Sequence, residues 1–161
     1  MIGQDEDIQK VFISRYQQGI FALALYLIGG NRDKAYDITV ASFVEALRTT
    51  PLPQNTDQFL IKLTRATIEQ CQGIKLVPLF NDSDFGDLPS TDKKSLAVVR
   101  AALQLLPLET KIPILLRDQL HFSYQDISFV LDISEHNAKI QTIQAHSQLR
   151  TKIAEVMNHE Q

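Results

Sequence analysis

The stretch from residue 123 to residue 150 constrains the fold most, because its apolar spacing breaks once and then resumes. Ser123 can cap a short helix that carries Ile127, Val130 and Leu131 on one face. The break falls at residues 132–134, and Ser134 can cap a second, longer helix. Small or apolar residues recur there every third or fourth position and form a seam able to face inward: Ala138, Thr142, Ala145 and Leu149. The stretch therefore predicts a helix-turn-helix.

Two interpretations of this helix-turn-helix remain open from spacing alone. A short helix, a tight turn and a longer helix are what a DNA-reading unit requires, because its second helix must project into the major groove. The same layout also serves as plain helical packing. Apolar periodicity does not separate the two.

Composition and periodicity predict an all-α fold. Hydrophobic residues make up 44% and charged residues 22% of the 161 residues, which is typical of a globular domain. Six glycines and six prolines are few, and no alternating apolar pattern of convincing length is present. The single cysteine, Cys71, excludes an internal disulfide and falls in an apolar helical stretch, which predicts a buried thiol.

Helical patterns also fill most of the remaining sequence. They cover about residues 8–28, 31–49, 56–72 and 93–105, and a further helix begins near Pro107. Residues 1–7 predict either a frayed start or a first helical turn, and residues after Ile153 are expected to fray. Residues 73–92 are rich in Asp and contain Gly and Pro, which predicts a linker. We therefore expect two small helical domains, 1–72 and 93–161, joined by the linker 73–92.

The sequence gives no support for an enzyme or for a bound cofactor. The four histidines have no metal-ligand spacing, Cys71 has no CxxC partner, and Gly29-Gly30 lacks a phosphate-loop frame. No apolar run reaches the roughly 18 residues of a membrane span, so we expect no membrane span and a cytoplasmic protein. The net charge is -3, and no third of the chain has a basic excess, which argues against strong binding to phosphates.

Several short motifs resemble the extracytoplasmic-function (group IV) sigma factors of RNA polymerase. In the C-terminal half they are Leu106-Pro107, Leu116-Arg117, the segment 123–127 and the turn 132–134, which occur in the order found in region 4 of that family. In the N-terminal half, Ala35-Tyr36-Asp37-Ile38, Phe43 and the segment 59–66 resemble region 2. The order of the two regions, with a linker between them, is that of the family.

This resemblance implies a transcription initiation regulator that binds core RNA polymerase and promoter DNA. The polymerase-docking positions are then Asp37, Ile38, Val40 and Ala41. The cations for melted DNA are Lys62 and Arg65. The DNA-contacting positions of the recognition helix are His136, Asn137, Lys139, Ile140, Gln141, Gln144 and Arg150.

The chain departs from the family at positions that carry binding chemistry. Val40 and Ala41 stand where the family has a glutamine and an acidic residue, and two arginine positions of the recognition helix are Gln141 and Gln144. A second stripe on that helix consists of His136, Ile140, Ile143 and Ser147. The alternative is therefore a sigma-like interaction module that binds an anti-sigma factor or another regulator, with weak or no DNA binding. The stripe can equally pack on Phe80 or Phe85 of the linker, and a third alternative is a dimeric helix-turn-helix regulator outside the sigma family.

Overall fold

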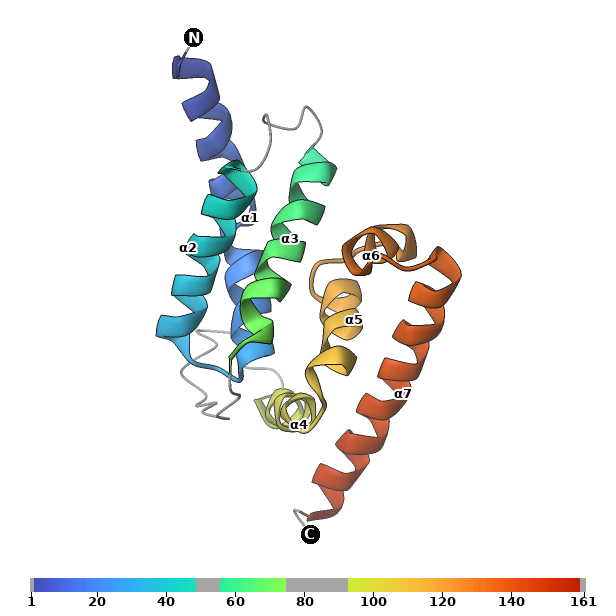
Figure 1. The fold of residues 1–161 in the computed structure, drawn as a ribbon. Coiled ribbons are helices and arrows are strands. Elements are labelled where there is room, and N and C mark those ends of the chain that lie inside the picture. Colours follow the sequence, from blue (N-terminus) through green and yellow to red (C-terminus); the bar gives the residue numbers. More distant parts are fainter. Residues whose placement is uncertain (1, 49–55, 75–92, 160–161) are drawn as a thin grey trace.

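A computed structural model describes residues 2–48, 56–74 and 93–159 of the chain. Within these ranges the chain forms seven α-helices and no strand (Figure 1), so the predicted all-α class is confirmed. The linker's Phe80 and Phe85 lie outside the described residues.

The first three helices pack side by side as α1 (Ile2–Ile28), α2 (Arg32–Arg48) and α3 (Thr56–Gln72). The helix α1 starts at Ile2, so the N-terminal residues form helical turns rather than a frayed start. It ends at Gly29 and Gly30, whose φ angles are 86° and 98°. Such angles favour glycine, and the Gly30 N–H donates to the Leu25 carbonyl at 2.9 Å, as expected of a helix C-terminus. Asn31 then caps α2 by accepting from the Lys34 N–H at 3.0 Å.

One aromatic side chain from each of these helices meets in their common core. Phe59 of α3 is fully buried, and its ring stacks on Phe12 of α1 with a centroid distance of 4.5 Å. Phe43 of α2 lies 6.4 Å from the same ring. Four buried hydroxyls each donate a hydrogen bond to the carbonyl one helical turn earlier, so their polar groups are satisfied inside the core: Thr39, Ser42, Thr64 and Thr67.

The segment Gln9–Ile28 of α1 is long and apolar enough, by length and composition alone, to cross a membrane. Polar residues interrupt this segment, so it contains no continuous apolar run of the length expected for a membrane span. In the structure, Ile20, Leu23 and Leu27 of this segment are fully buried and belong to the core shared with α2 and α3. This is the arrangement of a core helix.

The C-terminal half consists of α4 (Lys93–Gln104), α5 (Leu108–Asp118), α6 (Tyr124–Leu131) and α7 (Glu135–His159). The long helix α7 packs against the other three (Figure 1). The inward seam predicted for it is confirmed, because Ala138, Thr142, Ala145 and Leu149 are all buried. The expected fraying after Ile153 is wrong: α7 continues to His159, and Ile153 and Val156 pack on a buried cluster that includes side chains of α4 and α5.

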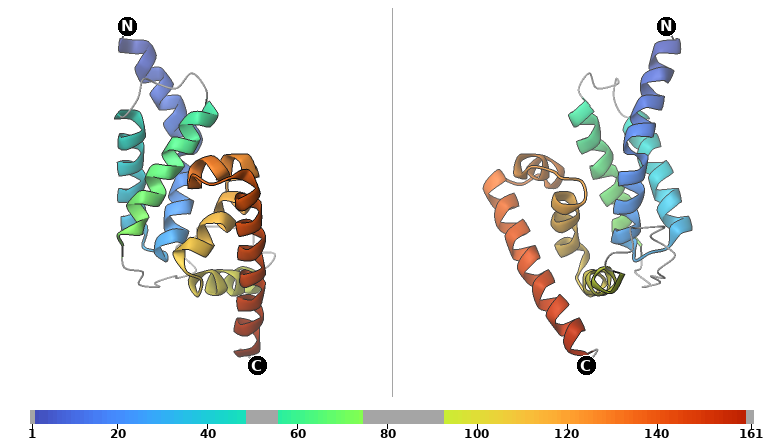
Figure 2. Two further views of the ribbon diagram at one scale, coloured as in Figure 1. Left: turned by 45° about the vertical axis from the view of Figure 1, so that its right-hand side comes forward. Right: turned by 180° about the vertical axis from the view of Figure 1, so that it is seen from behind.

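The two halves touch, and one hydrophobic core runs through both. Figures 1 and 2 show α6 beside α3, and the helix pairs α3–α6 and α1–α5 are both in contact. Leu116 of α5 and Ile127 of α6 belong to the same buried cluster as the side chains of α1–α3. At Gly19 in α1 an added Cβ would lie 3.3 Å from Leu120 Cδ2, so a small residue permits this close approach.

Lys111 in α5 is 2% exposed, and burial lowers the pKa of its ammonium group below the ordinary 10.5. Folding must therefore desolvate a charge, so we expect Lys111→Met to raise the free energy of unfolding by on the order of 1 kcal/mol at neutral pH. Between the lowered pKa and 10.5 the folded lysine loses its proton first, so the wild type gains stability as pH rises through that interval. The advantage of the variant should therefore shrink at alkaline pH.

Urea unfolding followed by circular dichroism, at neutral pH and at about pH 10, measures the difference in free energy of unfolding between Lys111→Met and the wild type. Lys139→Met is the matched control, because Lys139 is an exposed lysine on α7 and its replacement should leave both stabilities nearly unchanged. A Lys111→Met protein that is less stable than the wild type at neutral pH would contradict the expectation.

Candidate nucleic-acid interface

The first helix of the helix-turn-helix, α6, begins at a capping box. Ser123 Oγ accepts from the Asp126 N–H at 3.1 Å, and Asp126 Oδ2 accepts from the Ser123 N–H at 3.2 Å. The pair satisfies two backbone donors that a helix start otherwise leaves open. Arg117 Nη1 donates to the Phe122 carbonyl at 2.8 Å and its guanidinium lies 4.6 Å from the Tyr124 ring centre, so α5 holds the start of α6.

The chain bends at residues 132–134, as predicted. Asp132 takes the left-handed conformation, with φ 55° and ψ 49°, and its N–H donates to the Ser128 carbonyl. Asp tolerates this region better than most residues, so the turn forms without a glycine. Ile133 packs half-buried against the core, and Ser134 Oγ accepts from the Asn137 N–H at 3.1 Å to cap α7.

The recognition helix, which is the N-terminal part of α7, presents every predicted DNA-contacting side chain to solvent. The exposed residues are His136, Asn137, Lys139, Ile140, Gln141, Gln144 and Arg150. The remaining stripe residues, Ile143 and Ser147, are exposed as well. A surface of this kind can enter a groove because the opposite side of the same helix is buried.

Two side-chain contacts join α7 to α5. His146 Nε2 lies 2.9 Å from Asp118 Oδ2 at the end of α5, and Thr110 Oγ1 lies 3.3 Å from Gln148 Oε1. Thr142 Oγ1 donates to the Ala138 carbonyl at 2.7 Å, which satisfies the buried hydroxyl in the seam. No local sequence pattern could pair His146 with Asp118, which lies 28 positions away.

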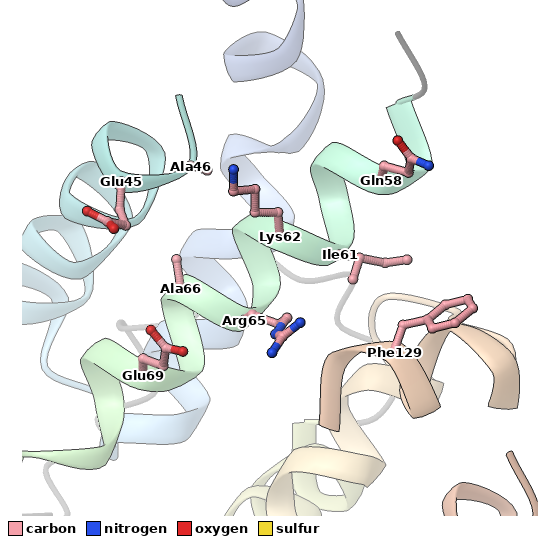
Figure 3. A pocket seen from close by; sticks show the side chains of 9 residues that line it. All are labelled: Glu45, Ala46, Gln58, Ile61, Lys62, Arg65, Ala66, Glu69 and Phe129. Atoms are coloured by element: carbon pink, nitrogen blue, oxygen red, sulfur yellow. The ribbon is translucent and has the colours of Figure 1, made fainter. Parts of the chain in front are cut away.

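The predicted cations of the N-terminal half, Lys62 and Arg65, lie one turn apart on α3 and line an open groove (Figure 3). The groove has a volume of about 620 Å³ and runs between α2, α3 and α6. Its lining consists of Glu45, Ala46, Gln58, Ile61, Lys62, Arg65, Ala66, Glu69 and Phe129. Phe129 comes from the other half of the molecule, and a sequence pattern for one half could not have placed it here.

The predicted polymerase-docking residues on α2 are only partly at the surface. Asp37 and Val40 are exposed and Ala41 is half-buried, but Ile38 is 5% exposed and packs in the core. Two further side chains extend the exposed face at four-residue spacing. Tyr36, Val40 and Val44 form this stripe, and the four-residue spacing in the sequence was the available signal for it.

The part of the chain that the structure describes brings together no group of three or more metal-ligating side chains. Cys71 is buried, and burial raises the pKa of its thiol to about 12. A thiol in this state stays protonated near neutral pH and is a poor nucleophile.

Comparison with known proteins bears on the C-terminal half. Residues 96–145 match the family described as sigma-70, region 4. No curated protein matches the chain. The matched residues run from α4 through the capping box and the turn into α7, so they contain the helix-turn-helix described above. Residues 96–145 of the chain are thus similar in sequence to sigma-70 region 4, and in the structure this segment forms a helix-turn-helix.

Proposed function

We propose that the protein is a transcription initiation regulator similar to the extracytoplasmic-function sigma factors, and that it binds core RNA polymerase and promoter DNA in the cytoplasm. The main observation that supports this proposal is the helix-turn-helix, whose second helix buries its predicted seam and exposes its predicted contact residues. The match of residues 96–145 to sigma-70 region 4 supports the same role. In this proposal residues 1–72 dock on polymerase, residues 93–161 read the promoter, and residues 73–92 link them.

The recognition helix supplies more base-reading groups than phosphate-binding groups. Asn137, Gln141 and Gln144 carry amides, which can form paired hydrogen bonds with adenine in the major groove. Lys139 and Arg150 are its basic residues, and Glu135 lies at its start. Affinity for nonspecific DNA is therefore low, and binding depends on salt less steeply than in a strongly basic reader.

The docking surface on α2 is more apolar than the family pattern. Tyr36, Val40 and Val44 are 63%, 46% and 56% exposed, and Asp37 lies between them. Such a face binds a partner by burying apolar area, with the carboxylate of Asp37 as its polar anchor. We therefore expect the polymerase contact on this chain to be weakly sensitive to salt.

Polymerase docking can be tested with the double substitution Val40→Asp/Val44→Asp. Two charges in the stripe should abolish retention of core RNA polymerase by the immobilised protein and should abolish promoter-dependent transcription with core polymerase. Val11→Asp is the control, because Val11 is 59% exposed on α1, outside the stripe. Retention of polymerase by the double variant at wild-type level would contradict docking through α2, and failure of the wild type to bind polymerase would contradict the proposed function itself.

DNA binding by the recognition helix can be tested with Lys139→Ala. Loss of one phosphate contact should weaken binding to a labelled duplex several-fold at low salt and should reduce the slope of log affinity against log salt by about 0.9. Lys152→Ala is the control, since Lys152 lies further along α7 and pairs with Glu155 at 3.1 Å. Equal affinities and equal salt slopes for the wild type and Lys139→Ala would show that this face of α7 does not contact the DNA phosphates.

A second candidate function has its own supporting observation. Ile140 and Ile143 are 38% and 51% exposed on the recognition helix, where isoleucine suits a protein surface better than phosphate. In this candidate the helix binds an anti-sigma factor or another regulator, and DNA binding is weak or absent.

The double substitution Ile140→Glu/Ile143→Glu addresses this candidate. The variant should no longer recover a small regulator in pull-downs from the native cell. Its affinity for DNA should fall no more than it does when two negative charges are added outside the recognition face. Leu105→Glu/Met157→Glu supplies that comparison, because both residues are exposed apolar side chains outside the recognition face. A small regulator that the Ile140→Glu/Ile143→Glu protein still recovers, or a wild-type pull-down that recovers polymerase subunits and no small regulator, would exclude the candidate.

A further inference from the structure

The outer face of α2 has the same residue spacing in both directions from its centre. Its exposed or half-buried residues follow one another at three, four, four and three positions: Asp33, Tyr36, Val40, Val44 and Leu47. Among the described helices α2 packs on α1 and α3, and it lies at the edge of the molecule away from α7 (Figure 1). A face that is symmetric about Val40 matches its own image when the helix is turned end for end, which is what a two-fold contact between identical chains requires.

The charges at the two ends of this face are opposite in sign. Asp33 is in the first turn of α2 and Arg48 is in the last, so along the helix axis they lie about 10 Å and 12 Å from Val40 at 1.5 Å per residue. When two α2 helices pack antiparallel about Val40, Asp33 of each copy therefore comes opposite Arg48 of the other. The Arg48 side chain is 74% exposed, and its pair with Glu45 at 3.2 Å is of the weak, exposed kind, so Arg48 can turn to a second carboxylate.

A hollow between α1 and α2 adjoins one end of the same face. It has a volume of about 230 Å³ and is lined by Gln17, Gln18, Phe21, Tyr36 and Thr39. In the antiparallel arrangement the residue opposite Tyr36 is Val44 of the second copy, so that side chain lies beside the hollow. The hollow therefore offers additional apolar area to the contact, once on each side of the two-fold axis.

We propose that a second copy of the chain binds this face, with the two α2 helices antiparallel and a two-fold axis at Val40. A crossing angle near 20° keeps Asp33 within reach of Arg48 of the second copy, whereas a crossing near 50° would separate them. One helix face is smaller than the roughly 800 Å² that each partner buries in a standard interface, so the dimer dissociates in the micromolar range. The same face is the proposed polymerase-docking surface. The consequence that dimerisation withholds the chain from polymerase therefore rests on the proposed function, whereas the dimer itself does not.

Charge reversal at the two ends of the face tests this arrangement. Asp33→Arg places two arginines opposite each other at both ends of the contact, and Arg48→Asp places two aspartates there. Each variant alone should therefore dimerise at least about tenfold more weakly than the wild type at low salt. In an equimolar mixture of the two variants every end contact again joins opposite charges, so a mixed dimer should form with wild-type affinity. Glu155→Arg is the control, because it makes the same change of charge as Asp33→Arg at an exposed position on α7 and should dimerise as the wild type does.

Sedimentation velocity of the full chain, over about a hundredfold range of micromolar concentration, measures the association, and circular dichroism checks that each variant keeps its helix content. A wild type that stays monomeric throughout, or single variants that associate as tightly as their mixture, would overturn the dimer. Retention of core polymerase by such a monomeric wild type would leave the proposed function standing. Dimerisation of a wild type that does not retain polymerase would instead contradict the proposed function and leave the dimer standing.

Discussion

The close packing of α7 on its neighbours is the interaction on which the rest of the structure depends. Ala138, Thr142 and Ala145 are small enough to let the backbone of α7 approach α5 and α6, and all three are buried. Burying this narrow seam leaves the other side of the helix exposed over the whole recognition segment. The same seam therefore provides the stability of the C-terminal half and sets the direction in which the contact residues point.

A second constraint is the core that crosses between the halves. The buried faces of α5 and α6 pack on α1 and α3, so the C-terminal helices complete the core of the N-terminal ones. The helix-turn-helix is consequently held in a defined orientation, and Phe129 is brought to the groove beside Lys62 and Arg65. Unfolding of either half exposes apolar surface on the other, which couples the stability of the two.

Local chemistry allowed much of the fold to be predicted, and non-local contacts explain what could not be. The helix over 56–72, the capping role of Ser123, the turn at 132–134 and the seam of α7 follow from spacing and from residues with strong positional preferences. The packing of Ile127 on α1–α3, the pair His146–Asp118 and the position of Phe129 join residues far apart in sequence. Helical periodicity showed that these residues had an inner or outer face, but it could not show which partner each face meets. Ile38 illustrates the same limit. The resemblance predicts it to be a polymerase-docking position on α2, but its side chain is buried in the core.

The chain combines the architecture of a DNA reader with few cations, so the position of its DNA-binding surface is more informative than its affinity for DNA. Amide chemical shifts of the isotope-labelled chain, followed by NMR during titration with a short duplex at low salt, locate that surface. We expect shift changes concentrated on the exposed face of α7 around Asn137, Gln141 and Gln144, with little change in α1 and α2. Changes confined to α1–α3, or an unaffected α7 at saturating DNA, would show that α7 is not the DNA-binding surface.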